Sequence, residues 1–443
     1  MIRPEKTLGA LAAISLALYV ALARLAPGNG WRDTGLFLLL VAALFAAYFA
    51  AFRNAERLNG KRLSLAIIAC ALLFRLALVP AGLPRETPLG DMLPLLASDL
   101  AGRQVVFEQQ LLYDDDHWRY LWDGHVAANG ISPFAFAPDD PRLDVLAPDG
   151  GVWQEIRHHV NHPWLTTIYP PVTQLAFRAL HAIAPASVVA LKLLWIAVDF
   201  LVILLVGKIV SRLGRPPSLL LLYAWNPLLI KSTAGSAHFD ILVALGVALL
   251  CWGLVSARRS VLAAGWTVAV ATKLTPLVFF LPVMRRLALR WTVVCAACIA
   301  VLLAPMIAGA GSGSGGEAFA RDWEFNATFF HAVKLLFARS DAAGQYARAV
   351  VACAVALAGW WVWRRFDGTR SADPAANVDA FADAALFPMA ILLLCGPVLM
   401  PWYVVWVLPL AAVTRRLFWF QSRPLCNWRF WSWWTAANGR SCS

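Results

Sequence analysis

Four aspartates lie close together between residues 113 and 123: Asp114, Asp115, Asp116 and Asp123. On a helix, Asp116, Tyr120 and Asp123 would share one face, because residues three, four and seven positions apart align. Neighbouring carboxylates repel, which raises a pKa unless a cation compensates, and such arrangements suit acid/base chemistry. The run also has a plainer interpretation as a solvated helix cap. Both readings therefore depend on what surrounds the aspartates.

The composition indicates a membrane protein. The chain of 443 residues is 60% hydrophobic and only 14% charged, with a mean hydropathy of +0.63. Apolar stretches of about 20 residues, the length that crosses a bilayer as a helix, recur along it. We predict an all-α polytopic membrane protein with about ten crossings. The predicted crossings are residues 7–26, 35–52, 63–82, 188–207, 218–235, 241–255, 291–309, 348–363, 380–400 and 402–413.

Two further apolar stretches, 166–184 and 261–283, contain prolines. Because proline interrupts helical hydrogen bonding, we expect both to be short or re-entrant membrane segments rather than simple crossings. We treat residues 1–416 as one transmembrane domain. Residues 417–443 form a tryptophan-rich tail to which we assign no role.

The basic residues orient these segments. Lysines and arginines in short loops, as in 53–62 and 208–215, fall on one predicted side, which identifies the cytoplasm and places both termini there. The net charge of +12 therefore requires no nucleic-acid partner. The loops 84–165 and 310–345 are then extracytoplasmic.

The first outer loop is unusually acidic. Residues 84–165 hold 13 of the 26 acidic residues and five of the eight histidines. Ease of translocation explains an acidic excess but not its clustering. Within this loop, 95–113 has the spacing of an amphipathic helix lying along the membrane surface, whereas 131–151 has turn chemistry and should be an ordered loop. We therefore expect a large structured loop.

Polar motifs elsewhere fall near the same predicted face. They lie in residues 167–174, 226–240, 271–282, 321–330 and 396–409, and we expect them to converge on one outer cavity. Two interpretations stay open for several of these residues. Lys273 either binds a phosphate or pairs with Asp199, and His238 and Asp240 either contact substrate or cap and pack a helix end.

The order of these motifs resembles a known family. Asp116, Arg119-Tyr120, Trp122-Asp123-Gly124, Gly130 and Pro133-Phe134 are similar to the first-loop signature of GT-C-type membrane glycosyltransferases, in particular the polyprenyl-phosphate-mannose-dependent, mannosyltransferase-like bacterial families. The later motifs follow in a similar order over residues 63–414: Tyr169-Pro170-Pro171, Asn226-Pro227, His238-Phe239-Asp240, Lys273 with Pro276, Phe325-Asn326 and Pro401-Trp402-Tyr403. Trp118, Phe134 and Ala237 depart from the common pattern.

The resemblance implies a GT-C-like fold and transfer, with inversion, of one hexose, mannose above all. The donor would be a polyprenyl-phosphate sugar and the acceptor a hydroxyl of an envelope glycolipid or glycan, at the outer face of the cytoplasmic membrane. The implied catalytic residues are Asp116 as general base, then Asp123 and Asp114. The implied substrate-binding residues are Arg119, Tyr120, Tyr169, His238, Asp240, Lys273, Asn326, Trp402 and Tyr403.

No cofactor is predicted. His158, His159 and His162 lack a clear metal-ligand set, so a divalent metal is conceivable but unsupported. The alternative function is a transporter or flippase of a polyprenyl-linked lipid or other solute. Such proteins carry midplane charges on paired broken helices and have small outer loops, whereas this chain concentrates its carboxylates in one large loop, which favours an enzyme.

The topology is directly testable. A cysteine replacing Asp149 should react with a membrane-impermeant maleimide added outside intact cells, whereas a cysteine replacing Asn59 should react only after permeabilisation. The reverse pattern would place the acidic loop in the cytoplasm.

Overall fold

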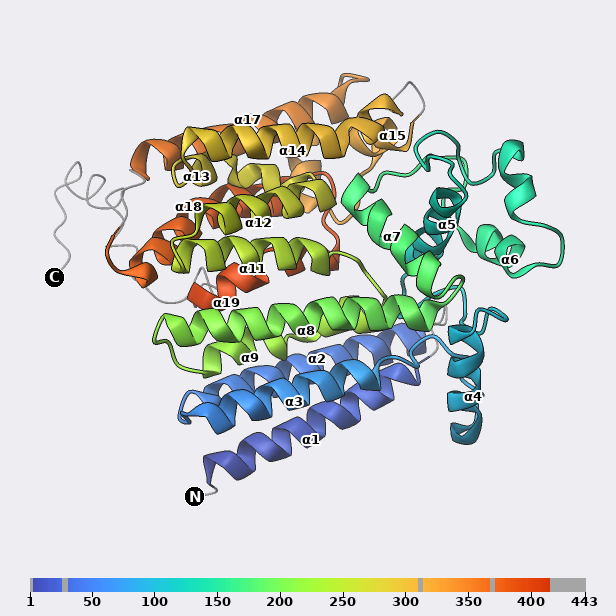
Figure 1. Cartoon of the computed structure of the whole chain (residues 1–443), viewed down its shortest axis with the longest axis horizontal. Helices are drawn as coiled ribbons and strands as arrows, with labels where there is room; N and C mark the ends of the chain where they lie inside the picture. The colour runs from blue at the N-terminus through green and yellow to red at the C-terminus, as the bar shows by residue number, and fades with distance from the viewer. Residues whose placement is uncertain (1–2, 26–30, 310–313, 367–370, 415–443) are drawn as a thin grey trace.

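The computed structural model describes residues 3–25, 31–309, 314–366 and 371–414 (Figure 1). It is 72% helix, and no β-strand forms among these residues, which confirms the predicted all-α class. An isolated bridge joins Phe325 to Val398. The tail 417–443 and residues 310–313 of the second outer loop lie outside the described residues.

A bundle of roughly parallel and antiparallel helices forms the body of the molecule (Figure 1). Its members are α1 (Pro4–Ala23), α2 (Trp31–Ala55), α3 (Lys61–Ala77), α8 (Val188–Arg212), α9 (Ser218–Ala224), α11 (Ile241–Val255), α12 (Arg259–Thr272), α14 (Leu289–Ala308), α17 (Ala343–Arg365), α18 (Pro374–Cys395) and α19 (Leu408–Thr414). Six of the described helices are long and apolar enough to span a bilayer: α1, α2, α8, α14, α17 and α18. The other predicted crossings fall on shorter or broken helices, so the count of ten stays a prediction.

The predicted crossing 218–235 is not one continuous helix. Helix α9 ends at Ala224, and a second helix begins after Asn226. The Asn226 side-chain oxygen caps this helix by accepting hydrogen bonds from the N–H groups of Leu228 and Leu229. Pro227 lacks an N–H and suits the first position of the short helix α10 (Pro227–Ile230). A π-helical turn, η2 (Lys231–Gly235), completes the segment. Such turns are frequent at functional sites.

Two more apolar segments are interrupted. The break predicted within 261–283 is confirmed, because α12 ends at Thr272 and η3 (Thr275–Phe279) and α13 (Phe280–Met284) follow. The predicted crossing 402–413 instead divides into η4 (Pro401–Trp406) and α19.

Shorter helices gather at one end of the bundle (Figure 1). They are α4 (Leu89–Leu100), α5 (Asp116–Ala128), η1 (Pro141–Leu146), α6 (Val152–His159), α7 (Pro171–Ile183), α15 (Gly315–Asp322) and α16 (Thr328–Leu335). Helix α4 runs across the bundle direction, as a surface helix would (Figure 1). The helix predicted over 95–113 is only partly right, because α4 ends at Leu100 and Gly102 has a φ of +64°. Residues 131–151 are non-helical as predicted, apart from η1.

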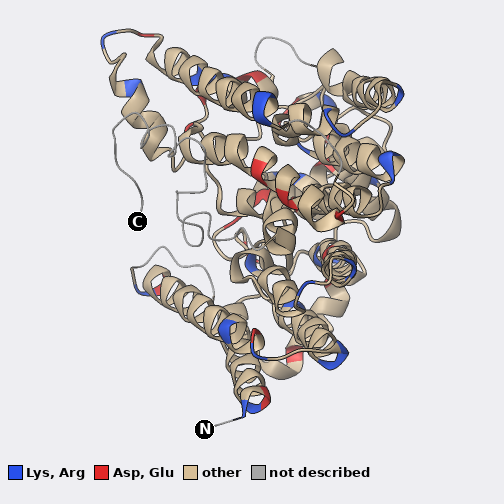
Figure 2. Cartoon of the chain, turned by 90° about the vertical axis from the view of Figure 1, so that its left-hand side faces the viewer, with Lys and Arg blue, Asp and Glu red and all other residues tan. Residues whose placement is uncertain are grey.

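Basic residues gather at the opposite end. Arg215 pairs with Asp379 at 2.8 Å, and Arg286 donates to the Asn377 side chain at 3.1 Å. These contacts bring together the loops at the ends of α8 and α13 and the start of α18. Figure 2 looks onto this side of the molecule and shows Lys and Arg at several helix ends.

Gly124 explains how α5 reaches the bundle. A Cβ at this position would lie 2.6 Å from the carbonyl oxygen of Phe177 on α7, so only glycine allows the two helices to approach so closely. Gly124 lies inside α5, not in a turn. The glycine sets the distance between α5 and α7.

Gly124→Ala should push α5 away from α7 and lower the midpoint of thermal unfolding in detergent. Gly90→Ala on α4 is the matched control, because no atom lies within 4 Å of the added Cβ. Equal stability of the two variants would contradict this account of the α5–α7 contact.

Candidate active site

The acidic loop 84–165 and the helix breaks enclose a cavity of about 990 Å³. The expected convergence is confirmed, because each of the five motif segments contributes a lining residue: Tyr169, Lys231, Lys273, Asn326 and Trp402. Asp114, Asp115, Asp116 and Arg119 line it from the loop side. The remaining wall is largely apolar, and includes Phe37 and Val41 of α2 and Leu392 and Leu393 of α18.

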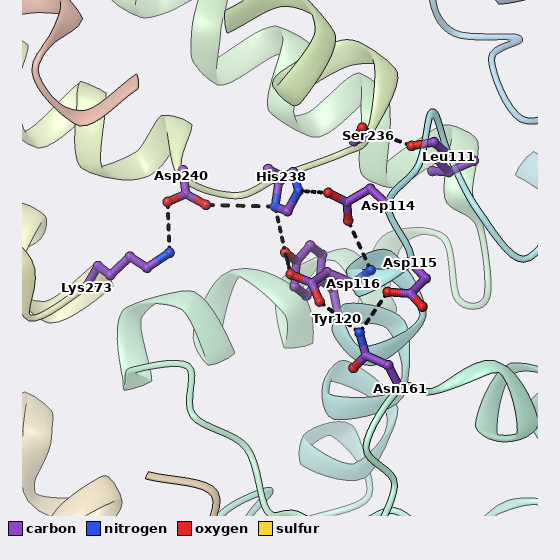
Figure 3. A network of polar contacts seen from close by, with 10 residues as sticks. All are labelled: Leu111, Asp114, Asp115, Asp116, Tyr120, Asn161, Ser236, His238, Asp240 and Lys273. Carbon is purple, nitrogen blue, oxygen red and sulfur yellow. Dashed lines mark hydrogen bonds and ion pairs between the residues drawn. The ribbon is translucent and has the colours of Figure 1, made fainter. Parts of the chain in front are cut away.

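A chain of four polar side chains lies beside this cavity (Figure 3). Asp114 Oδ2 contacts His238 Nε2, and His238 Nδ1 lies 3.0 Å from the Tyr120 hydroxyl. The same hydroxyl lies 3.4 Å from Asp116 Oδ2. The Tyr120 hydroxyl therefore lies between a ring nitrogen of His238 and the Asp116 carboxylate and can hydrogen-bond to either.

The residues just before Asp114 and His238 have a strained backbone conformation. Leu112 and Tyr113, just before Asp114, have φ values of 51° and 65°, and Ala237, just before His238, has a φ of 57°. Non-glycine residues with such values cluster at functional sites. The Ser236 hydroxyl donates to the Leu111 carbonyl at 2.9 Å, which ties the two strained segments together. The position of Asp114 against His238 is therefore held from both sides.

The two carboxylates next to the network differ in electrostatics. Burial opposes the charge on Asp114, yet the charge and hydrogen bond of His238 hold the pKa of Asp114 below its ordinary value. Burial and then the negative charge of Asp114 raise the pKa of Asp116. Asn161 donates to Asp116 at 3.0 Å and to Asp115 at 2.8 Å. Asp116 is thus the more basic carboxylate and lines the cavity, which suits a general base.

Asp123 does not line the cavity. It is 2% exposed, lies 4.0 Å from Arg119 and accepts a hydrogen bond from Gln174 at 2.9 Å. Arg119 also donates to the carbonyls of His162 and Leu165, which belong to the cavity wall. This geometry favours a role for Asp123 in positioning Arg119 and the wall over a role as base.

Lys273 has partners within the protein. Of the two alternatives for Lys273, the pair with Asp199 is excluded, because Asp199 binds Arg75 at 2.6 Å inside the bundle. Lys273 Nζ instead lies 2.9 Å from Asp240 Oδ1, which also accepts the Trp406 indole N–H at 2.5 Å. The ammonium faces three aromatic rings at 4.6–5.2 Å, those of Phe239, Tyr403 and Trp406. Lys273 thus lines the cavity as part of a cage.

The other predicted substrate-binding residues divide into two groups. Tyr169, Asn326, Trp402 and Tyr403 line the cavity. Tyr120, His238 and Asp240 lie buried behind its wall, where the His238 ring stacks on Trp402 with centroids 3.8 Å apart. The second group can orient the cavity residues but does not itself form the surface.

Sequence reasoning missed three residues of the site: Asn161, Lys231 and Trp406. Asn161 follows a histidine pair that drew attention to metals, and Trp406 is one of 21 tryptophans. Lys231 lay inside a segment interpreted as a continuous helix. Only the proline after Asn226 signalled the break that turns Lys231 toward the cavity.

A metal has one candidate location among the described residues. One ligand atom each of Asp114, Asp116 and His238 lie within 4.8 Å of one another, and carboxylates with imidazole suit a divalent cation. Within the protein, the Asp114 carboxylate already contacts His238 Nε2 and accepts the backbone N–H of Asp116 at 3.2 Å. His159 stacks on Trp118 and His162 packs against Trp323, so His158, His159 and His162 form no ligand cluster. The expectation of no metal stays a prediction.

The comparison with protein families identifies part of the chain. Residues 111–292 match the family model described as alpha-(1->6)-mannopyranosyltransferase, N-terminal domain, of the MptA_B family. No curated protein and no solved structure matches the chain significantly. The matched range contains Asp114, Asp116, His238 and Lys273, and it confirms the resemblance to membrane mannosyltransferases.

Lys273→Met should destabilise the protein by up to about 3 kcal/mol, because it leaves the buried Asp240 carboxylate without its cation. Adding Asp240→Asn should recover a large part of this loss, since the buried charge is then absent as well. Thermal unfolding of both single variants and the double variant measures the coupling. Additive effects would show that the pair is not a unit.

Proposed function

We propose that this protein is a membrane glycosyltransferase that transfers one mannose from a polyprenyl-phosphate donor, with inversion, to a hydroxyl of an envelope glycolipid or glycan. The match of residues 111–292 to a mannosyltransferase family model supports this proposal. The reaction takes place at the outer face of the cytoplasmic membrane. The observation that carries the proposal is the position of Asp116, a carboxylate of raised pKa that lines the cavity beside the Asp114–His238 contact.

The residues support a simple substitution at the anomeric carbon. The acceptor hydroxyl oxygen forms a new bond to that carbon, while the bond from the carbon to the phosphate oxygen breaks. Asp116 takes the hydroxyl proton, and polyprenyl phosphate leaves with the bonding electron pair. Attack from the side opposite the leaving group inverts the configuration, so an α-linked product requires a β-linked donor. Asp114 stays ionised against His238 and does not compete for the proton.

The cavity wall supports a lipid donor. Phe37 and Val41 on α2 and Leu392 and Leu393 on α18 present apolar surface to the same space as Asp116. Both helices are long and apolar enough to contact hydrocarbon. A polyprenyl chain can therefore lie along them while its phosphate and sugar reach the carboxylates.

The charge distribution supports the outer face. The basic helix ends lie at the opposite end of the bundle from the acidic loop (Figures 1 and 2). Basic residues favour the cytoplasmic side. The transporter alternative is set aside, because the matched family consists of enzymes by its description.

Asp116→Asn should insert and fold normally but lose about 10²- to 10⁴-fold in transfer rate, as expected when a general base is removed. Purified protein in nanodiscs, with polyprenyl-phosphate-mannose and an α-mannoside acceptor, measures transfer by mass spectrometry. In the wild type the rate should fall as the pH drops through the raised pKa of Asp116, since only the ionised carboxylate accepts a proton.

Asp115→Asn is the matched control, because Asp115 lines the same cavity and binds the same Asn161 but lacks the contact with Tyr120. It should retain much more activity. Near-normal turnover by Asp116→Asn would overturn the assignment of the base. No mannose transfer by the wild type from any polyprenyl-phosphate donor would overturn the proposed function.

A further inference from the structure

Lys231 occupies an unusual place for a lysine. It begins the π-helical turn η2 inside an apolar segment, and its side chain lines the cavity although the residue is only 9% exposed. Burying an ammonium is costly unless a partner compensates, and charges inside membrane proteins usually face a cavity or mark a ligand path.

No hydrogen bond or ion pair to Lys231 Nζ forms within the part of the chain that the structure describes. Asp114 is near enough to attract it electrostatically, but that carboxylate already contacts His238. The ammonium therefore carries three N–H donors that the protein leaves free toward the cavity.

The other two cations of the cavity wall are occupied. Arg119 donates to the carbonyls of His162 and Leu165, and Lys273 is bound to Asp240 within its aromatic cage. An anionic ligand in this cavity can therefore pair with Lys231 without breaking a hydrogen bond or ion pair within the protein, whereas pairing with Arg119 or Lys273 would compete with their present partners.

We propose that Lys231 binds the phosphate group of the polyprenyl-phosphate donor and stabilises it as it leaves. This inference rests on the proposed function. Leu228 lines the cavity three residues before Lys231 and so lies on the same side of the helical segment. The segment thus offers apolar contact followed by a positive charge, which matches the end of a lipid chain followed by its phosphate.

The charge on the phosphate explains why the interaction would assist the reaction as well as binding. The donor phosphodiester carries one negative charge, and the released phosphomonoester can carry two. A fixed ammonium in a largely apolar cavity stabilises this growing charge more than the ground state. Lys231 should therefore affect both the donor KM and kcat.

Lys231→Met removes the charge and keeps most of the apolar stem. Binding of a short-chain polyprenyl phosphate in nanodiscs should weaken about 10- to 100-fold, as for the loss of a hydrogen bond to a charged group. Binding of the neutral polyprenol should be unchanged. Lys208→Met is the matched control, because Lys208 lies over Trp252 on α8, outside the cavity lining, and should leave both affinities unchanged.

A measurement on the wild type avoids dependence on how the variant folds. Acylation of lysines by a small amine-reactive reagent, read by peptide mass spectrometry, should be slowed at Lys231 when polyprenyl phosphate is bound and not when polyprenol is bound. Lys208 should react equally in all three samples.

The outcomes separate the two proposals. Wild-type transfer and phosphate-dependent binding, combined with unchanged binding by Lys231→Met or no protection of Lys231, would overturn the role of Lys231 and leave the proposed function intact. Absence of both transfer and polyprenyl-phosphate binding in the wild type would overturn both.

Discussion

The buried contact between Asp114 and His238 is the interaction on which the rest of the site depends. It joins the acidic loop 84–165 to the break before α11 across 124 positions of sequence, and the two residues are 6% and 1% exposed. A carboxylate buried so deeply is costly unless a partner donates a hydrogen bond to it and offsets its negative charge. Because His238 holds Asp114 in place, Asp116 lies beside the negative charge of the Asp114 carboxylate, which raises the pKa of Asp116. The contact therefore determines both the position of the loop and which carboxylate is the stronger base.

Interrupted helices make room for this contact. In hydrocarbon, backbone N–H and C=O groups need internal partners, so non-helical segments are tolerated only where protein buries them or where they line a cavity. The break around Asn226, the segment between Thr272 and Thr275 and the approach to η4 all reach the cavity wall, where Leu228, Lys273 and Met400 are found. The unbroken helices α2 and α18 contribute mainly apolar side chains to the same wall, such as Phe37 and Leu392.

Much of the architecture could be predicted from local pattern. Apolar length predicted the helical class, and the prolines predicted the interruption within 261–283. The spacing of Asp116, Tyr120 and Asp123 is compatible with the helix that the structure shows there, α5. Partners of buried charges could not be predicted, because they depend on how distant helices pack. Lys273 binds Asp240 rather than Asp199, and Asp123 turns toward Gln174 rather than the cavity. The break at Asn226 was missed because apolar composition continues through it while only the backbone changes.

The family match ends at residue 292, but the site does not. Asp240 shares its carboxylate oxygen between Lys273 and Trp406, and His238 stacks on Trp402. The bridge between Phe325 and Val398 joins the segment between α15 and α16 to the segment that leads into η4. The carboxylates and His238 thus come from the matched range, whereas Trp402 and Trp406, which contact His238 and Asp240, come from the last third of the described chain. Since His238 contacts Asp114 on one side and stacks on Trp402 on the other, its position requires both parts to be packed together. The polar groups of the matched range therefore take up this arrangement only when α18 and η4 close the cavity beside them.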